Sequence, residues 1–304
     1  MPLHYSGNSR PRIDVITRRA ALLDVLLFPA GLAQLARGST AQLDQRFSDL
    51  EATSGGRLGV ATLDTASGGR ADHRAGERFP MCSTFKLLAV AAVLARVDRG
   101  REHLDRRIAF STADLLEYAP VTRARVAEGS MPIADLCEAA ITVSDNTAAN
   151  LLLATLGGPA GLTAYARSLG DRVTRLDRIE PALNEAVPGD PRDTTTPAAM
   201  LGDLTALLVG TALARASRER LIAWLVATKT GDRRLRAGVP AGWRVGDKTG
   251  SGEHGTTNDI GIVWPPGGGA VLVAAYLTET SRDTPACEAV LAGVGRMLAG
   301  MKER

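Results

Sequence analysis

The sequence predicts an α+β protein, in which a part with a β-sheet and helices packs against a mostly helical part. Three observations support this. Helical spacing dominates the middle of the chain, alternating apolar segments lie near both ends, and the composition is that of an ordinary globular protein. The 304 residues are 45% hydrophobic and 23% charged, which is enough for a sizeable core. Aromatic residues make up only 4%, so Leu, Val and Ala must form most of that core.

The expected elements in the N-terminal third follow from the spacing of apolar residues. Leu43, Phe47 and Leu50 recur at the spacing of one helix face. The next segment alternates like a strand, and Gly68-Gly69 then turns the chain into a hairpin. The third segment is apolar all round, which predicts a buried helix. These elements are a helix over 41–53, a strand over 57–65 and a helix over 83–97.

The rest of the chain is first helical and then switches to strand periodicity. Gly157-Gly158-Pro159 stops one of the helices, and residues 175–196 show no periodicity, as functional loops often do. The expected helices are 132–143, 147–156, 196–208 and 285–301, and the expected strands are 243–251, 257–264 and 270–278. The part with the sheet should comprise about 42–80 and 210–304, and the helical part about 81–209.

The N-terminus reads as an export signal. Arg18 and Arg19 precede a mildly apolar stretch over 20–36 that ends in small residues, which indicates the twin-arginine route. Cleavage is expected between 33 and 41, and the product should be periplasmic or secreted. The stretch is too short and, with Asp24, too polar for a good membrane span, so no stable membrane association is expected. An ordinary N-terminal helix is the alternative reading.

Charge, cysteines and histidines argue against several classes of protein. The net charge of +3 falls to +1 without residues 1–36, which hold four arginines and two aspartates, so nothing points to a nucleic-acid partner. Three cysteines cannot all pair internally, and we expect no disulfide. The four histidines lack the spacing of a zinc site, and no Gly-x-Ser-x-Gly occurs, so we expect neither a metallo-hydrolase nor an α/β-hydrolase. No metal or cofactor is expected.

A serine and a lysine three residues apart open the long apolar helix. On a helix, Ser83 and Lys86 share one face, and a serine hydroxyl becomes a good nucleophile when a nearby base takes its proton. Such a pair also arises by chance, as a helix-capping serine followed by a solvated lysine. Three further motifs complete it: Ser144-Asp145-Asn146, Lys248-Thr249-Gly250, and Glu180-Pro181-Ala182-Leu183-Asn184.

With these four motifs the chain resembles a class A serine β-lactamase over about residues 42–304. The resemblance implies the serine β-lactamase/D,D-peptidase-like fold: an antiparallel sheet with flanking helices, an all-helical lobe, and a site in the cleft between them. It implies hydrolysis of the β-lactam ring of penicillins and cephalosporins, and hence β-lactam resistance. We expect a monomer whose partner is the small-molecule substrate.

The resemblance also assigns catalytic roles. Ser83 would attack the lactam carbonyl, and Lys86 would assist its deprotonation. Ser144 would pass a proton to the departing nitrogen. Glu180 would activate the water that releases the acyl group, with Asn184 holding that water. Either Lys86 or Glu180 is a candidate base for acylation.

The substrate would be held along the strand with the Lys-Thr-Gly motif. Lys248 and Thr249 would bind its carboxylate, and Gly250 lets it lie close to the backbone. The main-chain N–H groups of Ser83 and Ser251 would form the oxyanion hole. The Ser251 hydroxyl would add a bond to the carboxylate.

Other contacts with substrate are expected from the flanking segments. Asn146 would bind the substrate's side-chain amide, and Tyr118 would form an aromatic wall or pack beside Pro120. Arg234 would supply a second cation for the carboxylate, since Thr257 stands where other members carry that arginine. The alternative for Arg234 is a solvated residue in a basic stretch.

The remaining implied features concern loops. Asp145 should order its own junction rather than touch substrate. An ion pair between Arg178 and Asp193 should clamp the loop that carries Glu180, and Pro181 permits the cis peptide that the family has there.

Two alternatives remain open. One is a D,D-peptidase or penicillin-binding protein, which shares the serine and lysine but lacks the water-activating glutamate. The other is a non-hydrolysing β-lactam sensor, which needs a membrane anchor or signalling segment, and none is visible in the sequence. Glu180 is the residue that distinguishes a hydrolase from both.

Ser251 and Cys82 suggest, by the family resemblance, useful turnover of cephalosporins as well as penicillins. We therefore expect the kcat/KM for cefotaxime to be readily measurable beside that for benzylpenicillin, because a few contacts change such ratios by only a few kcal/mol. Steady-state kinetics with both compounds checks this, and a vanishing value for cefotaxime would reject it.

Overall fold

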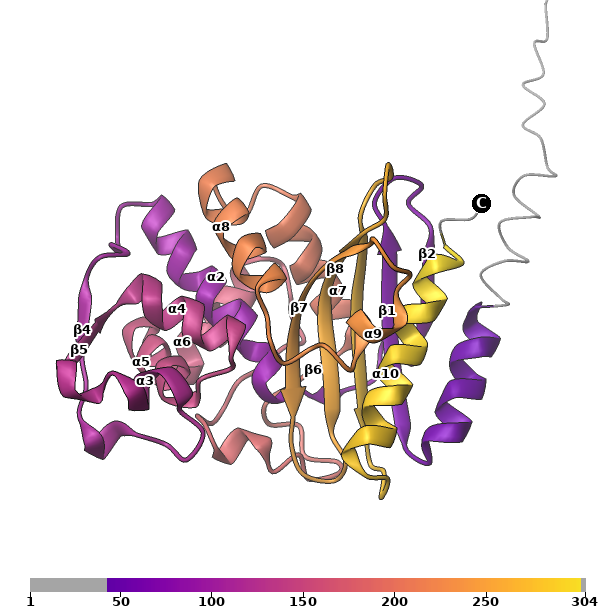
Figure 1. Ribbon diagram of the computed structural model, residues 1–304, viewed down its shortest axis with the longest axis horizontal. Coiled ribbons are helices and arrows are strands. Elements are labelled where there is room, and N and C mark those ends of the chain that lie inside the picture. Colours follow the sequence, from indigo (N-terminus) through magenta and orange to yellow (C-terminus); the bar gives the residue numbers. More distant parts are fainter. Residues whose placement is uncertain (1–42, 302–304) are drawn as a thin grey trace, which may run out of the picture.

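The computed structural model describes residues 43–301. Within them an antiparallel sheet of five strands runs through the molecule with helices on both faces (Figure 1). The strand order is β2-β1-β9-β8-β7, so the first strands pair beside the last. The expected α+β fold, with one sheet built from both ends of the chain, is confirmed. The strands are β1 (Arg57–Asp64), β2 (Arg70–His73), β7 (Arg244–Ser251), β8 (Thr257–Trp264) and β9 (Val271–Thr278).

Side chains alternate across the sheet and so feed two separate cores. On β9, Leu272, Ala274 and Tyr276 face the helical part, whereas Val271 and Val273 face the opposite way. This is the two-residue period of a strand, with both faces buried. The helix over residues 43–54 and α10 (Thr284–Ala299) cover the second face, as Figure 1 shows.

The first core lies between the sheet and a group of helices around α2. This helix is apolar on nearly every side and is buried from Phe85 to Ala95. The helices are α2 (Phe85–Asp98), α3 (Pro120–Ala124), α4 (Ile133–Thr142), α5 (Asn146–Leu156), α6 (Gly158–Ser168), α7 (Pro197–Leu204), α8 (Arg215–Val226) and α9 (Leu235–Gly238). Of these, α4, α5, α6 and α8 pack on α2, while α7 packs on β1 and β9.

Helices α6 and α8 were not predicted. Gly157 ends α5 with a left-handed backbone, as expected, but Pro159 then lies in the first turn of α6, where its missing N–H costs nothing. Helix α7 is shorter than predicted and continues as a wider π-helical turn over Thr205–Val209.

Short elements connect these layers. Two strand pairs form away from the main sheet, β3 (Phe79–Pro80) with β6 (Thr194–Thr195) and β4 (Arg107–Ala109) with β5 (Ser130–Pro132). The 3₁₀ turns are Cys82–Thr84, Thr112–Asp114, Val126–Glu128 and Ala182–Asn184. The pairing of β3 with β6 joins the entry of α2 to the end of the irregular segment 175–196.

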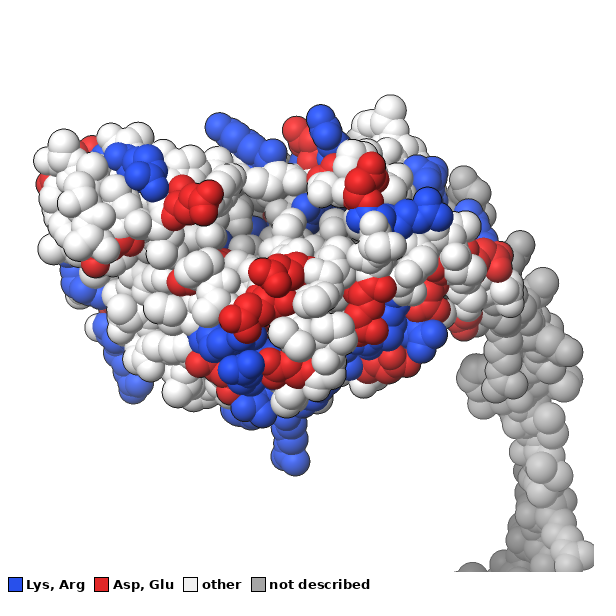
Figure 2. Space-filling model, turned by 90° about the horizontal axis from the view of Figure 1, so that it is seen from below, with Lys and Arg blue, Asp and Glu red and all other residues white. Residues whose placement is uncertain are grey.

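Other features bear on the remaining predictions. Cys82, Cys137 and Cys287 are buried and unpaired. Of the helices in residues 43–301, none has the length and apolar character needed to cross a bilayer. Basic and acidic side chains are interspersed on the face shown in Figure 2. The predicted export signal lies outside the described residues.

Candidate active site

Ser83 and Lys86 enter the site from the start of α2. Ser83 sits in the 3₁₀ turn Cys82–Thr84, and Lys86 follows in the first turn of the helix. The Ser83 Oγ donates a hydrogen bond to Glu180 Oε1 at 2.9 Å, and Lys86 Nζ lies 3.0 Å from the same oxygen. Glu180 is therefore the group that links the serine to the lysine, since none of the hydrogen bonds of Ser83 and Lys86 in the structure joins the two directly.

The junction between α4 and α5 supplies the second wall. Asp145 caps α5 by accepting from Ala148 N, and its carboxylate also accepts from Thr122 N, so it orders the junction as predicted. Ser144 takes a positive φ of 58° there. Lys86 Nζ donates to Ser144 Oγ at 3.2 Å and to Asn146 Oδ1 at 2.6 Å.

The edge strand β7 supplies the third wall. Lys248 is fully buried and donates to Ser144 Oγ at 3.0 Å, which completes a chain of hydrogen bonds from Glu180 through Lys86 and Ser144. Thr249 Oγ1 hydrogen-bonds the hydroxyl of Thr230 at 2.6 Å.

Arg234 is not a solvated arginine. Its Nη1 donates to the carbonyls of Gly250 and Asn258, each at 2.8 Å, and Nη2 donates to Ser251 Oγ at 2.7 Å. Glu288 of α10 lies 3.6 Å from its Nε. The guanidinium is thus held at the end of β7 by the carbonyls of two adjacent strands.

The irregular segment 175–196 supplies the fourth wall, beside Ser83 and Lys86. Asn184 Nδ2 donates to Glu180 Oε2 at 2.5 Å, and the Glu180–Pro181 peptide is cis. The predicted ion pair is present, with Arg178 Nε 2.6 Å from Asp193 Oδ2. Because Asp193 is buried and also accepts two backbone N–H groups, this pair has the geometry that holds a loop.

These walls enclose a cavity of about 350 Å³. Tyr118 is 51% exposed at its rim and therefore does not pack into the core. Lys86, Glu180 and Lys248 lie just behind the wall, bonded to residues that line it. The structure thus brings all the predicted site residues together. The lining residues are Ser83, Tyr118, Ser144, Asn146, Asn184, Thr230, Arg234, Thr249, Gly250 and Ser251.

Burial shapes the protonation of both lysines. Desolvation lowers the pKa of Lys86, and the Glu180 carboxylate partly opposes this shift. Desolvation also lowers the pKa of Lys248 well below its usual value, and the positive charges of Lys86 and Arg234 lower it further. Three cationic side chains against the Glu180 carboxylate make this cavity suited to an anionic ligand.

Two residues of the site were missed from the sequence. Asn150 holds the backbone of Glu180 on both sides, donating to its carbonyl at 2.9 Å and accepting from its N–H at 3.0 Å. Its position four residues after Asn146, in an otherwise apolar helix, was a usable signal. Thr230 lies in a loop, where no spacing marks it.

Known proteins resemble this chain over most of its length. The model of the β-lactamase enzyme family matches residues 42–300. β-Lactamase AST-1 of Nocardia asteroides is 52% identical over 86% of this chain and 84% of its own. The ancestral (GNCA) class A β-lactamase structure superposes with a TM-score of 0.84 at 64% identity, over 86% of this chain and all of that one. A putative class A β-lactamase, PenP from Rhodopseudomonas palustris, gives 0.84 at 59%, over 86% and 99%.

Fold, site and relatives agree on one class of enzyme, the serine β-lactamases. The chain belongs to this family, and within it to class A.

Replacing Arg234 should weaken the binding of substrates that carry a carboxylate. We expect Arg234→Ala to lower kcat/KM for benzylpenicillin by about 10- to 100-fold, as for the loss of a hydrogen bond to a charged group. The penalty should largely vanish with the methyl ester, which lacks that charge. Arg233→Ala, at an exposed neighbouring position, is the control. An equal loss of kcat/KM for benzylpenicillin and for its methyl ester would show that Arg234 only supports the strand.

Proposed function

We propose that this protein hydrolyses β-lactams through an acyl-enzyme on Ser83, which a water activated by Glu180 then releases. The observation that carries the proposal is the position of Glu180 Oε1, in contact with both Ser83 Oγ and Lys86 Nζ. A carboxylate there can serve the serine in the first half of the reaction and a water in the second.

In the acylation step, Ser83 Oγ bonds to the lactam carbonyl carbon and the C–N bond of the ring breaks. The serine proton passes to Glu180 Oε1, to which it is already hydrogen-bonded, or to Lys86, whose neutral form is more accessible than that of an ordinary lysine because desolvation lowers its pKa. The ring nitrogen receives a proton from Ser144, and Lys86, within hydrogen-bond distance, resupplies Ser144. A proton held by Glu180 then passes to Lys86, so Glu180 is again a carboxylate before the second half of the reaction. The main-chain N–H groups of Ser83 and Ser251 would stabilise the oxyanion.

In the deacylation step, a water attacks the ester carbon and Glu180 accepts its proton. The ester C–O bond breaks, and Ser83 Oγ takes a proton back to regenerate the hydroxyl. Asn184 supports this step because its amide already contacts the Glu180 carboxylate, so both side chains can bind the same water. Asn150 keeps Glu180 in place by its two backbone hydrogen bonds.

The substrate would lie between β7 and the α4–α5 junction. Lys248, Thr249 and Arg234 would hold its carboxylate, while Asn146 and Tyr118 would contact its side chain. We further propose that the protein acts as an exported monomer, taken across the membrane by the twin-arginine route, and that it confers resistance to β-lactams.

Hydrolysis of nitrocefin tests the proposal directly. The wild-type protein should turn over many equivalents, because Glu180 provides a base for deacylation. Ser83→Ala should lower kcat by at least about 10⁴-fold, as in other serine hydrolases without their nucleophile. A single burst of one equivalent without turnover would favour the penicillin-binding protein or the sensor instead.

Glu180→Ala should separate the two steps. Acylation retains Lys86 as a base, whereas deacylation loses the group that activates water, so a stable adduct with benzylpenicillin should accumulate. Intact-protein mass spectrometry would show it as a mass increase equal to one substrate. Glu185→Ala, an exposed glutamate of the same segment, is the matched control and should show no lasting adduct. Absence of an adduct in Glu180→Ala would sink the role given to Glu180.

A further inference from the structure

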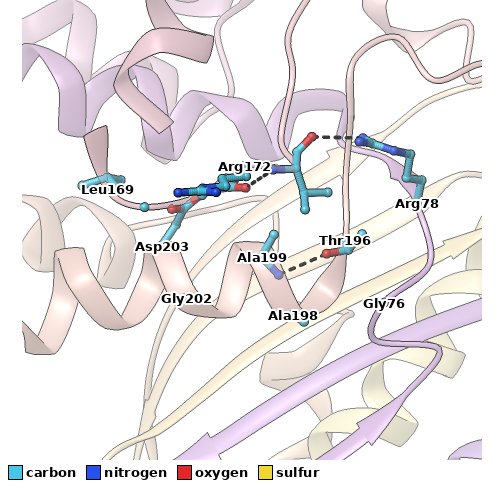
Figure 3. A pocket seen from close by; sticks show the side chains of 12 residues that line it. Gly76, Arg78, Leu169, Arg172, Thr196, Ala198, Ala199, Gly202 and Asp203 are labelled. Atoms are coloured by element: carbon cyan, nitrogen blue, oxygen red, sulfur yellow. Dashed lines mark hydrogen bonds between the residues drawn. The ribbon is translucent and has the colours of Figure 1, made fainter. Parts of the chain in front are cut away.

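A second cavity, of about 810 Å³, lies between the turn after α6 and helix α7 (Figure 3). It shares no lining residue with the active-site cavity. Figure 3 shows Asp203 rising from α7 toward the turn that carries Leu169 and Arg172. Asp171, in that turn, also lines the cavity.

Asp171 and Asp203 line the same cavity, and each has one carboxyl oxygen, Oδ2, without a hydrogen-bond partner among residues 43–301. Asp203 is 1% exposed and Asp171 is 8% exposed. Both Oδ2 atoms are buried, and a hydrogen bond with Asp171 is among the causes that raise the pKa of Asp203. Two carboxyl oxygens can make such a contact only when one of them carries a proton.

The charged and titratable groups around this pair shift the pKa of Asp203 in opposite directions. Burial and the Asp171 carboxylate raise the pKa of Asp203 to about 9, and Arg167 of α6 opposes this shift. Tyr165 of α6 and Tyr276 of β9 also face the pair, and the charge of Asp203 contributes to raising the pKa of both phenols. Arg78 and Arg172 line the same cavity, and Arg78 donates to Val173 O and Thr194 Oγ1.

The pair stands at both ends of the segment that carries Glu180. On the entry side, Asp171 Oδ1 accepts from the N–H groups of Val173 and Thr174, at 2.6 and 3.0 Å. The Thr174 hydroxyl then hydrogen-bonds that of Thr195 at 2.6 Å, on the exit side. Asp203 lies on α7, the helix that follows the exit. The contact between the two carboxyls therefore joins the chain before residue 175 to the chain after residue 196.

We propose that a proton shared between Asp171 and Asp203 ties together the two ends of segment 175–196, which makes Asp203 a positioning residue for Glu180 and Asn184. The kinetic consequence rests on the proposed function, whereas the effect on stability does not. Two carboxylates repel one another, so the tie weakens as Asp203 loses its proton.

The direction of the pH dependence follows from the raised pKa. Between the ordinary aspartate pKa and about 9, the folded protein binds a proton that the unfolded chain has released. Stability therefore falls as the pH rises through this range and levels off above it. An asparagine at 203 would donate its amide hydrogen to Asp171 at every pH and remove this dependence.

The experiment compares thermal midpoints of the full chain and kcat for benzylpenicillin between pH 5 and 10. Relative to wild type, Asp203→Asn should gain stability with rising pH, by about 3 °C or more across the range. Its kcat should also persist to higher pH. Asp203→Ala should be less stable than Asp203→Asn at every pH, because it cannot donate to Asp171. Glu219→Gln, an exposed carboxylate on α8, is the control and should track wild type.

The outcomes separate the parts of the inference. If the thermal midpoints of wild type and Asp203→Asn changed with pH in parallel, the shared proton would be overturned. If the thermal midpoints of the two proteins diverged with pH but their kcat values fell at the same alkaline pH, the positioning role of Asp203 would be overturned. If the wild-type protein turned over no β-lactam, the proposed function would fail, while the midpoints would still decide whether the proton is shared.

Discussion

The site depends on one buried ion pair, between Lys86 of α2 and Glu180 of the irregular segment. Both side chains are 0% exposed, and Lys86 Nζ lies 3.0 Å from Glu180 Oε1. Removing two charges from water costs several kcal/mol for each ion, so such a pair persists only when further hydrogen bonds satisfy it. Ser144 and Asn146 provide these bonds on the lysine side, and Ser83 and Asn184 on the carboxylate side. The need to satisfy two charges therefore fixes where three separate segments must meet.

The walls around this pair differ in how they are held. Helix α2 is anchored by extensive apolar packing and strand β7 by its pairing with β8 over all eight residues, so Ser83 and Lys248 are carried by regular elements. The segment 175–196 contains little regular structure and is held by polar contacts: the Arg178–Asp193 ion pair, the backbone bonds of Asn150 and the hydroxyl pair of Thr174 and Thr195 at its two ends. Polar contacts respond to pH and salt, whereas apolar packing responds much less. The segment that carries Glu180 should therefore respond to solution conditions more than β7 and α2 do.

The spacing of apolar residues predicted the elements that are buried on one whole face or on all sides. The strands β8 and β9 and the helix α2 were recognised because runs of apolar residues leave little choice. Helix α8 was missed because its sequence is rich in arginine and mixes its few buried residues with charged ones. Helix α6 was missed because Pro159 marks both the end of one helix and the start of another, and the sequence does not say which applies. The short pairs β3–β6 and β4–β5 exist only because distant segments meet, and two or three residues carry no pattern.

The sequence alone identified the reactive side chains of the site, a serine, two lysines and a glutamate, because each lies in a short motif that can be recognised locally. The tertiary structure alone decided which atoms meet. Ser83 lies three residues from Lys86, yet its hydroxyl hydrogen-bonds Glu180, 97 positions away, and Lys86 reaches Ser144 and Asn146 instead. Arg234, one of several neighbouring arginines, is buried and donates to carbonyls of two adjacent strands. Spacing along a chain indicates which face a residue occupies, but a hydrogen bond between distant segments depends on how their elements pack, and no local pattern encodes that.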